Sequence, residues 1–226
     1  MRDHIHTIPV LDALRDPQGC AFCTMKKKLE TDAVRFIMGP AYMEEDVRME
    51  TNKAGFCKYH MNSLYNEQNR LGLALMLHTH LQQISNDTEK IKSSPPVKLF
   101  GKSPLFPRLQ EHMAKTHASC YICRRVDDTF DRYVDTFFYL WRKNGEEAKL
   151  IESQTNYCMP HFLMLFNKGE KFRDVLLPLW QKIIQELESD LDWFTQKFDH
   201  RNADAPWKNS KDALPRAIDF LGGYKC

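Results

Sequence analysis

The sequence lacks any long hydrophobic run. Its longest weakly polar stretch, from Leu71 to Leu81, has eleven residues and includes two histidines. A membrane-spanning helix needs about 18 to 20 consecutive apolar residues. The opening residues, Met1 to Pro9, also lack the apolar segment of a secretory signal peptide. We therefore expect a cytoplasmic protein without a transmembrane segment.

An excess of charge of one sign is also missing. The chain has 32 lysines and arginines against 30 aspartates and glutamates, a formal net charge of +2. This balance is too even to indicate nucleic-acid or membrane binding from charge alone. With 42% hydrophobic and 27% charged residues, the 226-residue chain has the composition of a folded globular protein, which excludes disorder.

Several sequence signatures are absent as well. The chain contains no glycine-rich phosphate loop, no G-x-S-x-G nucleophile motif and no H-E-x-x-H zinc-protease motif. No stretch alternates between apolar and polar residues with a period of two, so we expect no substantial sheet. The sequence thus points to no familiar catalytic class and favours an all-α fold.

What the sequence does contain is a duplicated arrangement of cysteine and histidine. Each copy reads C-x2-C, a long gap, and then C-x2-H. The first set consists of Cys20, Cys23, Cys57 and His60, and the second of Cys120, Cys123, Cys158 and His161. The gaps are 33 (57−23−1) and 34 (158−123−1) residues, and corresponding positions lie 100 or 101 residues apart. This register predicts an internal duplication of about a hundred residues.

Three thiolates and one imidazole form a typical closed zinc site, because a C-x2-C pair lets two sulfurs converge on one ion. We therefore predict two Zn²⁺ ions per chain, with iron–sulfur clusters at the same ligands as the alternative. Disulfides would leave the matched histidines unexplained, and they are rare in the cytoplasm. The near-equal gaps favour sites that are self-contained within each copy, but spacing also permits ligand pairs crossed between the copies.

Apolar spacing predicts helices almost throughout. Apolar residues recur every three or four positions after each C-x2-C pair, over 22–36 and 122–140. Short helices follow around 44–50 and 146–152, and Cys57 and Cys158 each start a further helix. Both metal sites should thus lie at helix N-termini, where unsatisfied amides favour thiolates.

The expected architecture is two tandem pseudo-repeated helical units. Residues 1–92 form the first metal-binding repeat and 109–226 the second, with a proline-rich linker at 93–108. The halves should pack together, because a unit of about 90 residues is only marginally stable alone.

The chain resembles an uncharacterised family of bacterial proteins, seen mostly in Firmicutes, that carries this doubled arrangement. The resemblance covers the full length and rests on specific ligand motifs and weaker flanking ones. The ligand motifs are Cys20-Ala-Phe-Cys23 with Glu30 following, Gly55-Phe56-Cys57-Lys-Tyr-His60, Cys120-Tyr-Ile-Cys123 and Cys158-Met-Pro-His161. Asn156-Tyr157 departs from the Gly-Phe that usually precedes the later cysteine. The resemblance implies the fold and the metal ligands, but no activity.

These observations favour a metal-binding scaffold that serves as a binding or adaptor module for a protein partner. An enzyme is the less favoured alternative, since a complete Cys3His set leaves no open coordination position. Its candidate general bases would be Glu30, Glu44, Glu45 and Asp46, for which exposed helix faces are the ordinary explanation. Nucleic-acid binding is weakly supported by basic residues at 26–28 and 124–125.

The remaining histidines and the last cysteine have weaker interpretations. His78 and His80 point in different directions on a helix, so one should be solvated and the other should lie at the edge of the core. His4 and His6 would share one face of an extended segment. His117 could replace His161 as a ligand, but its counterpart in the first copy is Pro17. Cys226 has no counterpart in the duplication.

Overall fold

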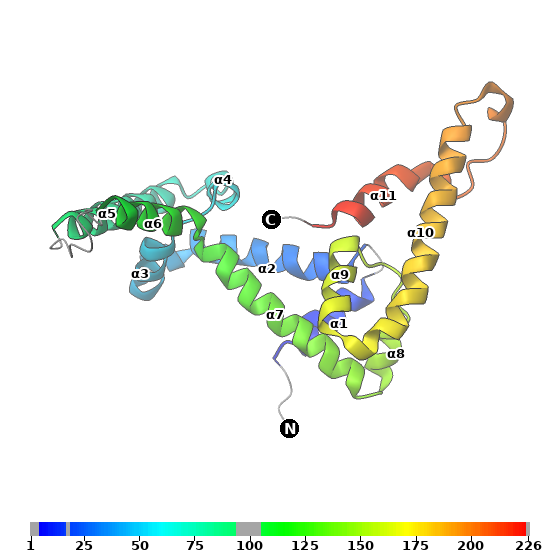
Figure 1. The fold of residues 1–226 in the computed structure, drawn as a ribbon, viewed down its shortest axis with the longest axis horizontal. Helices are drawn as coiled ribbons and strands as arrows, with labels where there is room; N and C mark the ends of the chain where they lie inside the picture. Colours follow the sequence, from blue (N-terminus) through cyan, green and yellow to red (C-terminus); the bar gives the residue numbers. More distant parts are fainter. Residues whose placement is uncertain (1–4, 17–18, 94–104, 225–226) are drawn as a thin grey trace. The chain divides into compact units, whose positions relative to one another are not determined.

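The structure is a computed structural model that describes residues 5–16, 19–93 and 105–224. These ranges fold into eleven α-helices and several short 3-10 turns, and they contain no strand. The all-α fold expected from the apolar spacing is therefore confirmed (Figure 1). A search of the same ranges finds no helix with the length and apolar character needed to span a bilayer.

The chain divides into two compact units. The central unit runs from Leu29 to Thr129, and the split unit contains the described residues up to Lys28 and from Phe130 onward. The division differs from the expected halves 1–92 and 109–226, because it falls inside two long helices, each with different packing partners along its length. Residues 94–104 of the expected linker lie outside the described residues, and Leu105 to Arg108 belong to a helix.

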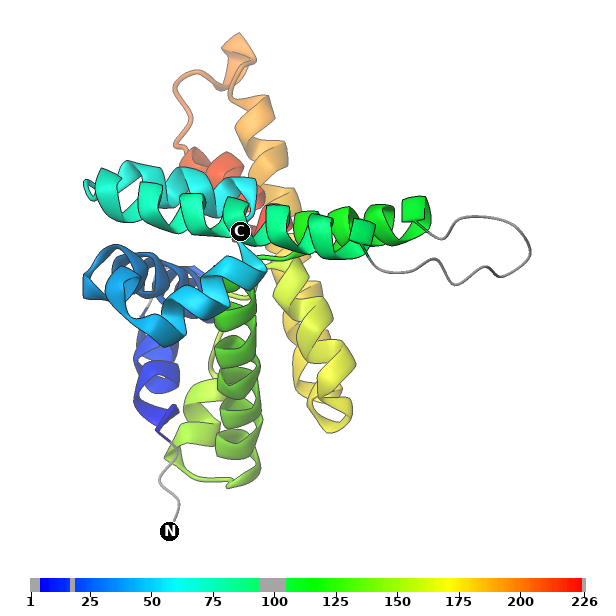
Figure 2. The ribbon, with the colours of Figure 1, turned by 90° about the vertical axis from the view of Figure 1, so that its left-hand side faces the viewer.

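The central unit contains the second part of α2 and the first part of α7. Four complete helices lie between these parts. The bounds are α2 Ala21–Met38, α3 Glu45–Ala54, α4 Lys58–Asn66, α5 Arg70–Ser93, α6 Leu105–Ala118 and α7 Tyr121–Arg142. A 3-10 turn, Pro40–Met43, follows α2 where Gly39 and Pro40 end the helical pattern, as their sequence predicts. α5 packs on α3 and α6, and Figure 2 shows α5 and α6 side by side.

The split unit holds the other parts of α2 and α7 and five further helices. These are α1 Thr7–Arg15, α8 Glu146–Glu152, α9 Met159–Lys168, α10 Arg173–Gln196 and α11 Ala213–Gly222. α9, α10 and α11 pack on one another, and α1 packs on α8. Pro178 is accommodated in the second turn of α10 rather than ending it. The helices expected at 44–50 and 146–152 are both present.

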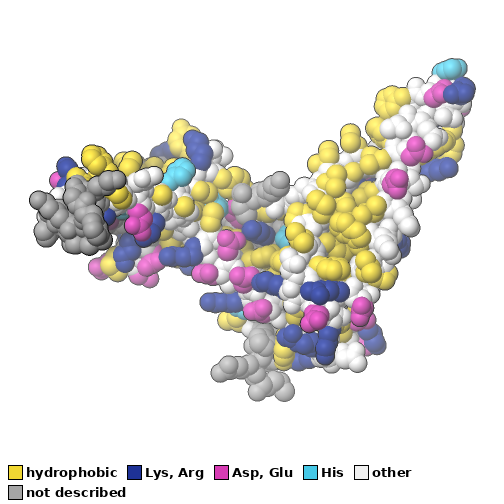
Figure 3. Space-filling model, viewed as in Figure 1, with side chains coloured by type: hydrophobic (Ala, Val, Ile, Leu, Met, Phe, Trp, Pro, Cys, Tyr) yellow, Lys and Arg dark blue, Asp and Glu magenta, His cyan; other side chains and the backbone are white. Residues whose placement is uncertain are grey.

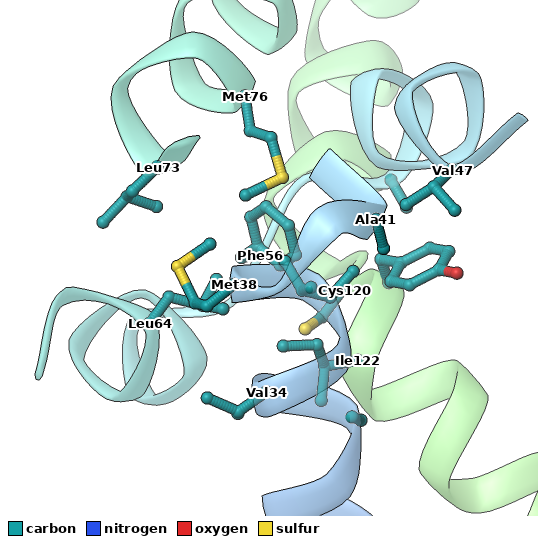
Figure 4. Packing of buried hydrophobic residues seen from close by; sticks show 14 of the residues in the cluster. Val34, Met38, Ala41, Val47, Phe56, Leu64, Leu73, Met76, Cys120 and Ile122 are labelled. Carbon is teal, nitrogen blue, oxygen red and sulfur yellow. The ribbon is translucent and has the colours of Figure 1, made fainter. Parts of the chain in front are cut away.

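Each unit has its own core. In the central unit Phe56 lies between Met38 and Met76, surrounded by apolar residues of α2, α3, α4 and α7 (Figure 4). In the split unit the core is aromatic: the Phe22 and Phe137 rings meet edge-on at 5.0 Å, and Phe137 meets Phe172 at 5.5 Å. All three rings of this second core are fully buried. Each core contacts a group of cysteines and histidines.

Candidate metal centres

Two groups of four ligand atoms stand out, one in each unit. Within each group the four atoms, three Sγ and one histidine nitrogen, all lie within 4.8 Å of one another. The Cys57 cluster belongs to the central unit and consists of Cys57, His60, Cys120 and Cys123. The Cys158 cluster belongs to the split unit and consists of Cys20, Cys23, Cys158 and His161.

The pairing of the motifs is the crossed one. Each C-x2-C pair meets the C-x2-H pair of the other copy, so the self-contained pairing favoured by the equal gaps is not found. The reason lies in α2 and α7: each helix begins with its cysteine pair in one unit and ends in the other. The equal gaps do not discriminate between self-contained and crossed pairing. Both pairings use the same motifs at the same positions in the sequence.

The separations within each cluster match the edges of a small tetrahedron. In the Cys57 cluster, Nδ1 of His60 lies 3.3 Å from the Sγ atoms of Cys57 and Cys120 and 3.4 Å from that of Cys123. The Cys57 and Cys123 sulfurs are 3.8 Å apart. A zinc ion with bonds of about 2.3 Å to sulfur and 2.0 Å to nitrogen implies edges of about 3.8 Å between sulfurs and about 3.5 Å from sulfur to nitrogen.

The Cys158 cluster has similar dimensions. Nδ1 of His161 lies 3.4 Å from the Sγ atoms of Cys20 and Cys23 and 3.0 Å from that of Cys158. The Cys23 and Cys158 sulfurs are 3.5 Å apart. Both donor sets therefore have the chemistry and the spacing to surround one ion each.

The cysteine sulfurs of both clusters are positioned by the starts of four helices. Cys57 and Cys158 are the N-caps of α4 and α9, so the histidine three residues later lies one helical turn away. Cys20 and Cys120 directly precede α2 and α7. The partial positive charge of a helix N-terminus favours thiolate over thiol, which is why both motifs belong at these positions. The expected placement of the clusters at helix N-termini is confirmed.

Gly55 joins the two halves of the Cys57 cluster. Its carbonyl oxygen accepts a 2.9 Å hydrogen bond from the backbone N–H of Tyr121, which ties the segment before Cys57 to the start of α7. Its φ of +59° lies in the left-handed region, and a Cβ at this position would collide with the ring of His80. That ring is held in place by a 2.7 Å hydrogen bond between its Nδ1 and the carbonyl oxygen of Asn52.

We therefore expect Gly55→Ala to lower the free energy of unfolding by about 1–3 kcal/mol through overpacking against His80, in addition to backbone strain. Gly19→Ala is the matched control, because Gly19 also has a positive φ, +79°, but has open space around its Cβ position. Urea unfolding of both variants separates the collision from the strain. Equal losses in the two variants would show that the contact with His80 costs nothing.

Glu30 lies beside the Cys57 cluster, a contact that sequence reasoning did not predict. Its side chain is buried, and its Oε1 lies 2.7 Å from Nε2 of His60, on the side of the ring away from the sulfurs. A carboxylate at this position fixes the orientation of a metal-binding imidazole and increases its basicity. The ordinary explanation from the sequence, an exposed helix face, is wrong for Glu30 because its side chain is buried. Its distance of seven residues from Cys23 does not indicate a contact with the other cluster.

The Cys158 cluster has different surroundings. Phe130 stands seven residues after Cys123, as Glu30 does after Cys23, and its ring packs 5.7 Å from that of His161. The ring of Phe22 packs on the same histidine at 5.5 Å. In the described part of the chain, the side-chain hydrogen-bonding contacts of His161 all involve Nδ1. This histidine is thus surrounded by aromatic rings where His60 has a carboxylate.

A backbone segment after α11 completes this cluster. The N–H of Tyr224 donates a 3.3 Å hydrogen bond to Sγ of Cys23. Gly223 has a φ of +59°, and a Cβ there would lie 2.8 Å from Sγ of Cys158. Neither residue was expected from the sequence, because the contact spans 201 residues and arises only from the packing of α11 on α9.

Within the clusters the thiols share protons unequally. Hydrogen bonds from Cys158 and Cys23 lower the pKa of Cys20, whereas the bond with Cys20 raises the pKa of Cys158 to about 11. In the Cys57 cluster burial, followed by the charge of Cys120, raises the pKa of Cys123. Because metals bind thiolates, loading either cluster must release these protons.

The other candidate residues lie apart from the clusters. Glu44, Glu45 and Asp46 are exposed at the start of α3, as the ordinary explanation predicted. His78 is exposed and His80 is buried, which confirms the expected difference between them.

His117 is exposed on α6 and belongs to neither cluster, whereas His161 is a member of the Cys158 cluster, so His117 does not replace it. His6 lies in the turn before α1, not in an extended segment. His4 and Cys226 fall outside the described residues.

Comparison with known proteins identifies the family to which the chain belongs. The chain belongs to a family of unknown function, DUF6062, whose model matches residues 1–226. This agrees with the full-length resemblance to an uncharacterised family. Searches of curated proteins and of solved structures return no match.

Proposed function

We propose that this chain, from a family without an assigned role, is a cytoplasmic helical scaffold that binds two structural zinc ions. The ions would occupy the Cys57 and Cys158 clusters, each through three cysteines and one histidine. The observation that carries the proposal is the convergence of both Cys3His sets on volumes the size of one tetrahedral ion. A complete set of four protein ligands is typical of structural rather than catalytic zinc.

The dimensions of the clusters favour single ions over iron–sulfur clusters. In a multi-iron cluster the protein ligands bind different irons, so their atoms spread around the inorganic core. Here the sulfurs approach to 3.5 and 3.8 Å, as on one ion. Zinc also suits a mixed thiolate and imidazole set in a tetrahedral site.

The proposed role of the ions is to supply folding free energy. In the Cys57 cluster the ligands come from α4 and from the start of α7, positions 66 residues apart. In the Cys158 cluster Cys20 and His161 are 141 residues apart. Ions that link such distant segments make metal binding part of the folding reaction.

A protein partner is the interaction that this scaffold supports best. α11 exposes Leu214, Ile218 and Leu221 at helical spacing, and Figure 3 shows hydrophobic side chains gathered over α9, α10 and α11. Apolar patches of this kind are typical of protein interaction surfaces. The basic residues beside the clusters give less support to nucleic acid, since Arg124 pairs with Glu50 and Arg125 lies over the ring of Phe36.

Metal analysis of anaerobically purified protein by plasma mass spectrometry, with a visible spectrum of the same sample, tests the proposal. We expect two zinc ions per chain and a colourless sample. Iron together with acid-labile sulfide, and a brown colour, would replace zinc with iron–sulfur clusters and make electron transfer or sensing the function. Protein free of bound metal would overturn both.

A further inference from the structure

We propose that the two zinc ions are held unequally: the ion of the Cys158 cluster exchanges readily, whereas that of the Cys57 cluster is fixed by Glu30. The inference rests on the proposed function, since it assumes that both clusters bind zinc. It assigns metal exchange, and any regulation that follows from exchange, to one cluster of the two.

The first support is the difference around the two histidines. Glu30 and His60 are both buried, with 3% and 0% of their surfaces exposed, and their side chains meet at 2.7 Å. A buried carboxylate holds the imidazole in its metal-binding orientation and strengthens its bond to the ion. His161 has the rings of Phe22 and Phe130 instead, which pack against it but supply no hydrogen-bond acceptor.

The second support is the access that small molecules have to the Cys158 cluster. A cavity of about 460 Å³ in the split unit is lined by the ligands Cys20 and Cys158 and by residues of α10 and α11, among them Leu179, Ile183, Arg216 and Phe220. A small chelating molecule that enters this cavity lies against two of the three cysteines, which are themselves buried. Ligand exchange at zinc requires an incoming donor, so a cavity beside the thiolates provides the path along which the ion leaves.

The third support is the segment that covers the Cys158 cluster. Cys23 receives its hydrogen bond from the backbone of Tyr224, and Gly223 lies against Cys158. This cover depends on α11, whose outer face is exposed. Two of the ten residues of α11, Ala213 and Ala217, are buried, so the segment opens more easily than a core helix does.

The test follows zinc release from the full chain into an excess of the coloured chelator 4-(2-pyridylazo)resorcinol. We expect two phases of one ion each, separated by about 10- to 100-fold in rate, the range by which an outer carboxylate changes metal affinity. Samples taken after the first phase and alkylated with iodoacetamide identify the emptied cluster by peptide mass spectrometry. We expect label on Cys20, Cys23 and Cys158 and protection of Cys57, Cys120 and Cys123.

Two matched pairs of variants separate the causes. Glu30→Gln should accelerate the slow phase by about 10-fold and leave the fast phase unchanged, because it removes the charge behind His60. Glu89→Gln, which changes an exposed carboxylate of α5 in the same unit, should alter neither phase. Ile183→Trp should narrow the cavity and slow the fast phase, whereas Ile184→Trp, a neighbour that does not line the cavity, should not.

Release of both ions at one rate, or first labelling at Cys57, Cys120 and Cys123, would overturn the unequal holding. An unchanged slow phase in Glu30→Gln would overturn the role of Glu30. Failure of the proposed function looks different, because the purified protein would then carry no zinc before the chelator is added.

Discussion

Replacing Cys23 and Cys158 together by serine should leave one zinc ion per chain, whereas replacing Cys23 and Cys57 together should leave none. The first pair of residues belongs to the Cys158 cluster alone, so the Cys57 cluster stays complete. The second pair removes one sulfur from each cluster. Metal content of the two purified variants, measured by plasma mass spectrometry, gives the result directly.

The two double variants control each other, because each removes two thiols. If the sites were self-contained within the copies, the outcomes would be reversed: Cys23 with Cys57 would leave one ion, and Cys23 with Cys158 would leave none. A double variant that fails to fold is recognised by loss of its helical circular dichroism signal. In that case the number of zinc ions per chain is measured on the single variants Cys57→Ser and Cys158→Ser. Each should retain one ion, held by the untouched cluster, which alkylation mapping identifies.

Removing both ions should destabilise the protein strongly. A ligand that binds only the folded state adds about 2.7 kcal/mol at a free concentration 100 times its dissociation constant. Two such ions therefore contribute about 5 kcal/mol, which compares with a total stability of about 5–15 kcal/mol for a typical domain. We expect treatment with a strong chelator to lower Tm, measured by circular dichroism at low protein concentration, by about 10–20 °C.

Zinc added back should restore Tm, and magnesium should not, because thiolates and imidazole do not suit that hard cation. An unchanged Tm after complete removal of the metal would show that the cores around Phe56 and Phe137 hold the units without it.

Much of the fold could be predicted from the sequence, because helix formation depends on local pattern. The apolar period after each C-x2-C pair predicted α2 and α7, and the break at Gly39-Pro40 predicted where α2 ends. The placement of Cys57 and Cys158 at helix starts followed from the same local reasoning. Local pattern thus determined which residues could act together within one turn.

The choice of partners depends on tertiary packing and was beyond the sequence. The near-equal gaps favoured Cys57 as the partner of Cys23, but Cys158 also follows at a permissible distance, and the fold brings Cys158 to Cys23. Glu30 illustrates the same limit: its position on α2 suggested an exposed charge or a general base, yet the fold buries it against His60. The contact of Tyr224 with Cys23 connects residues 201 positions apart and left no trace in the motif.

The crossed pairing has a consequence for how such a chain could arise. A single ancestral repeat, with one C-x2-C pair and one C-x2-H pair, cannot complete either cluster alone in this arrangement. Two copies exchanging these pairs would complete both clusters, as a symmetric homodimer does. The duplication predicted from the sequence would then correspond to the fusion of two associating protomers, and the later exchange of glutamate for phenylalanine at one of two matching positions would have made equal sites unequal.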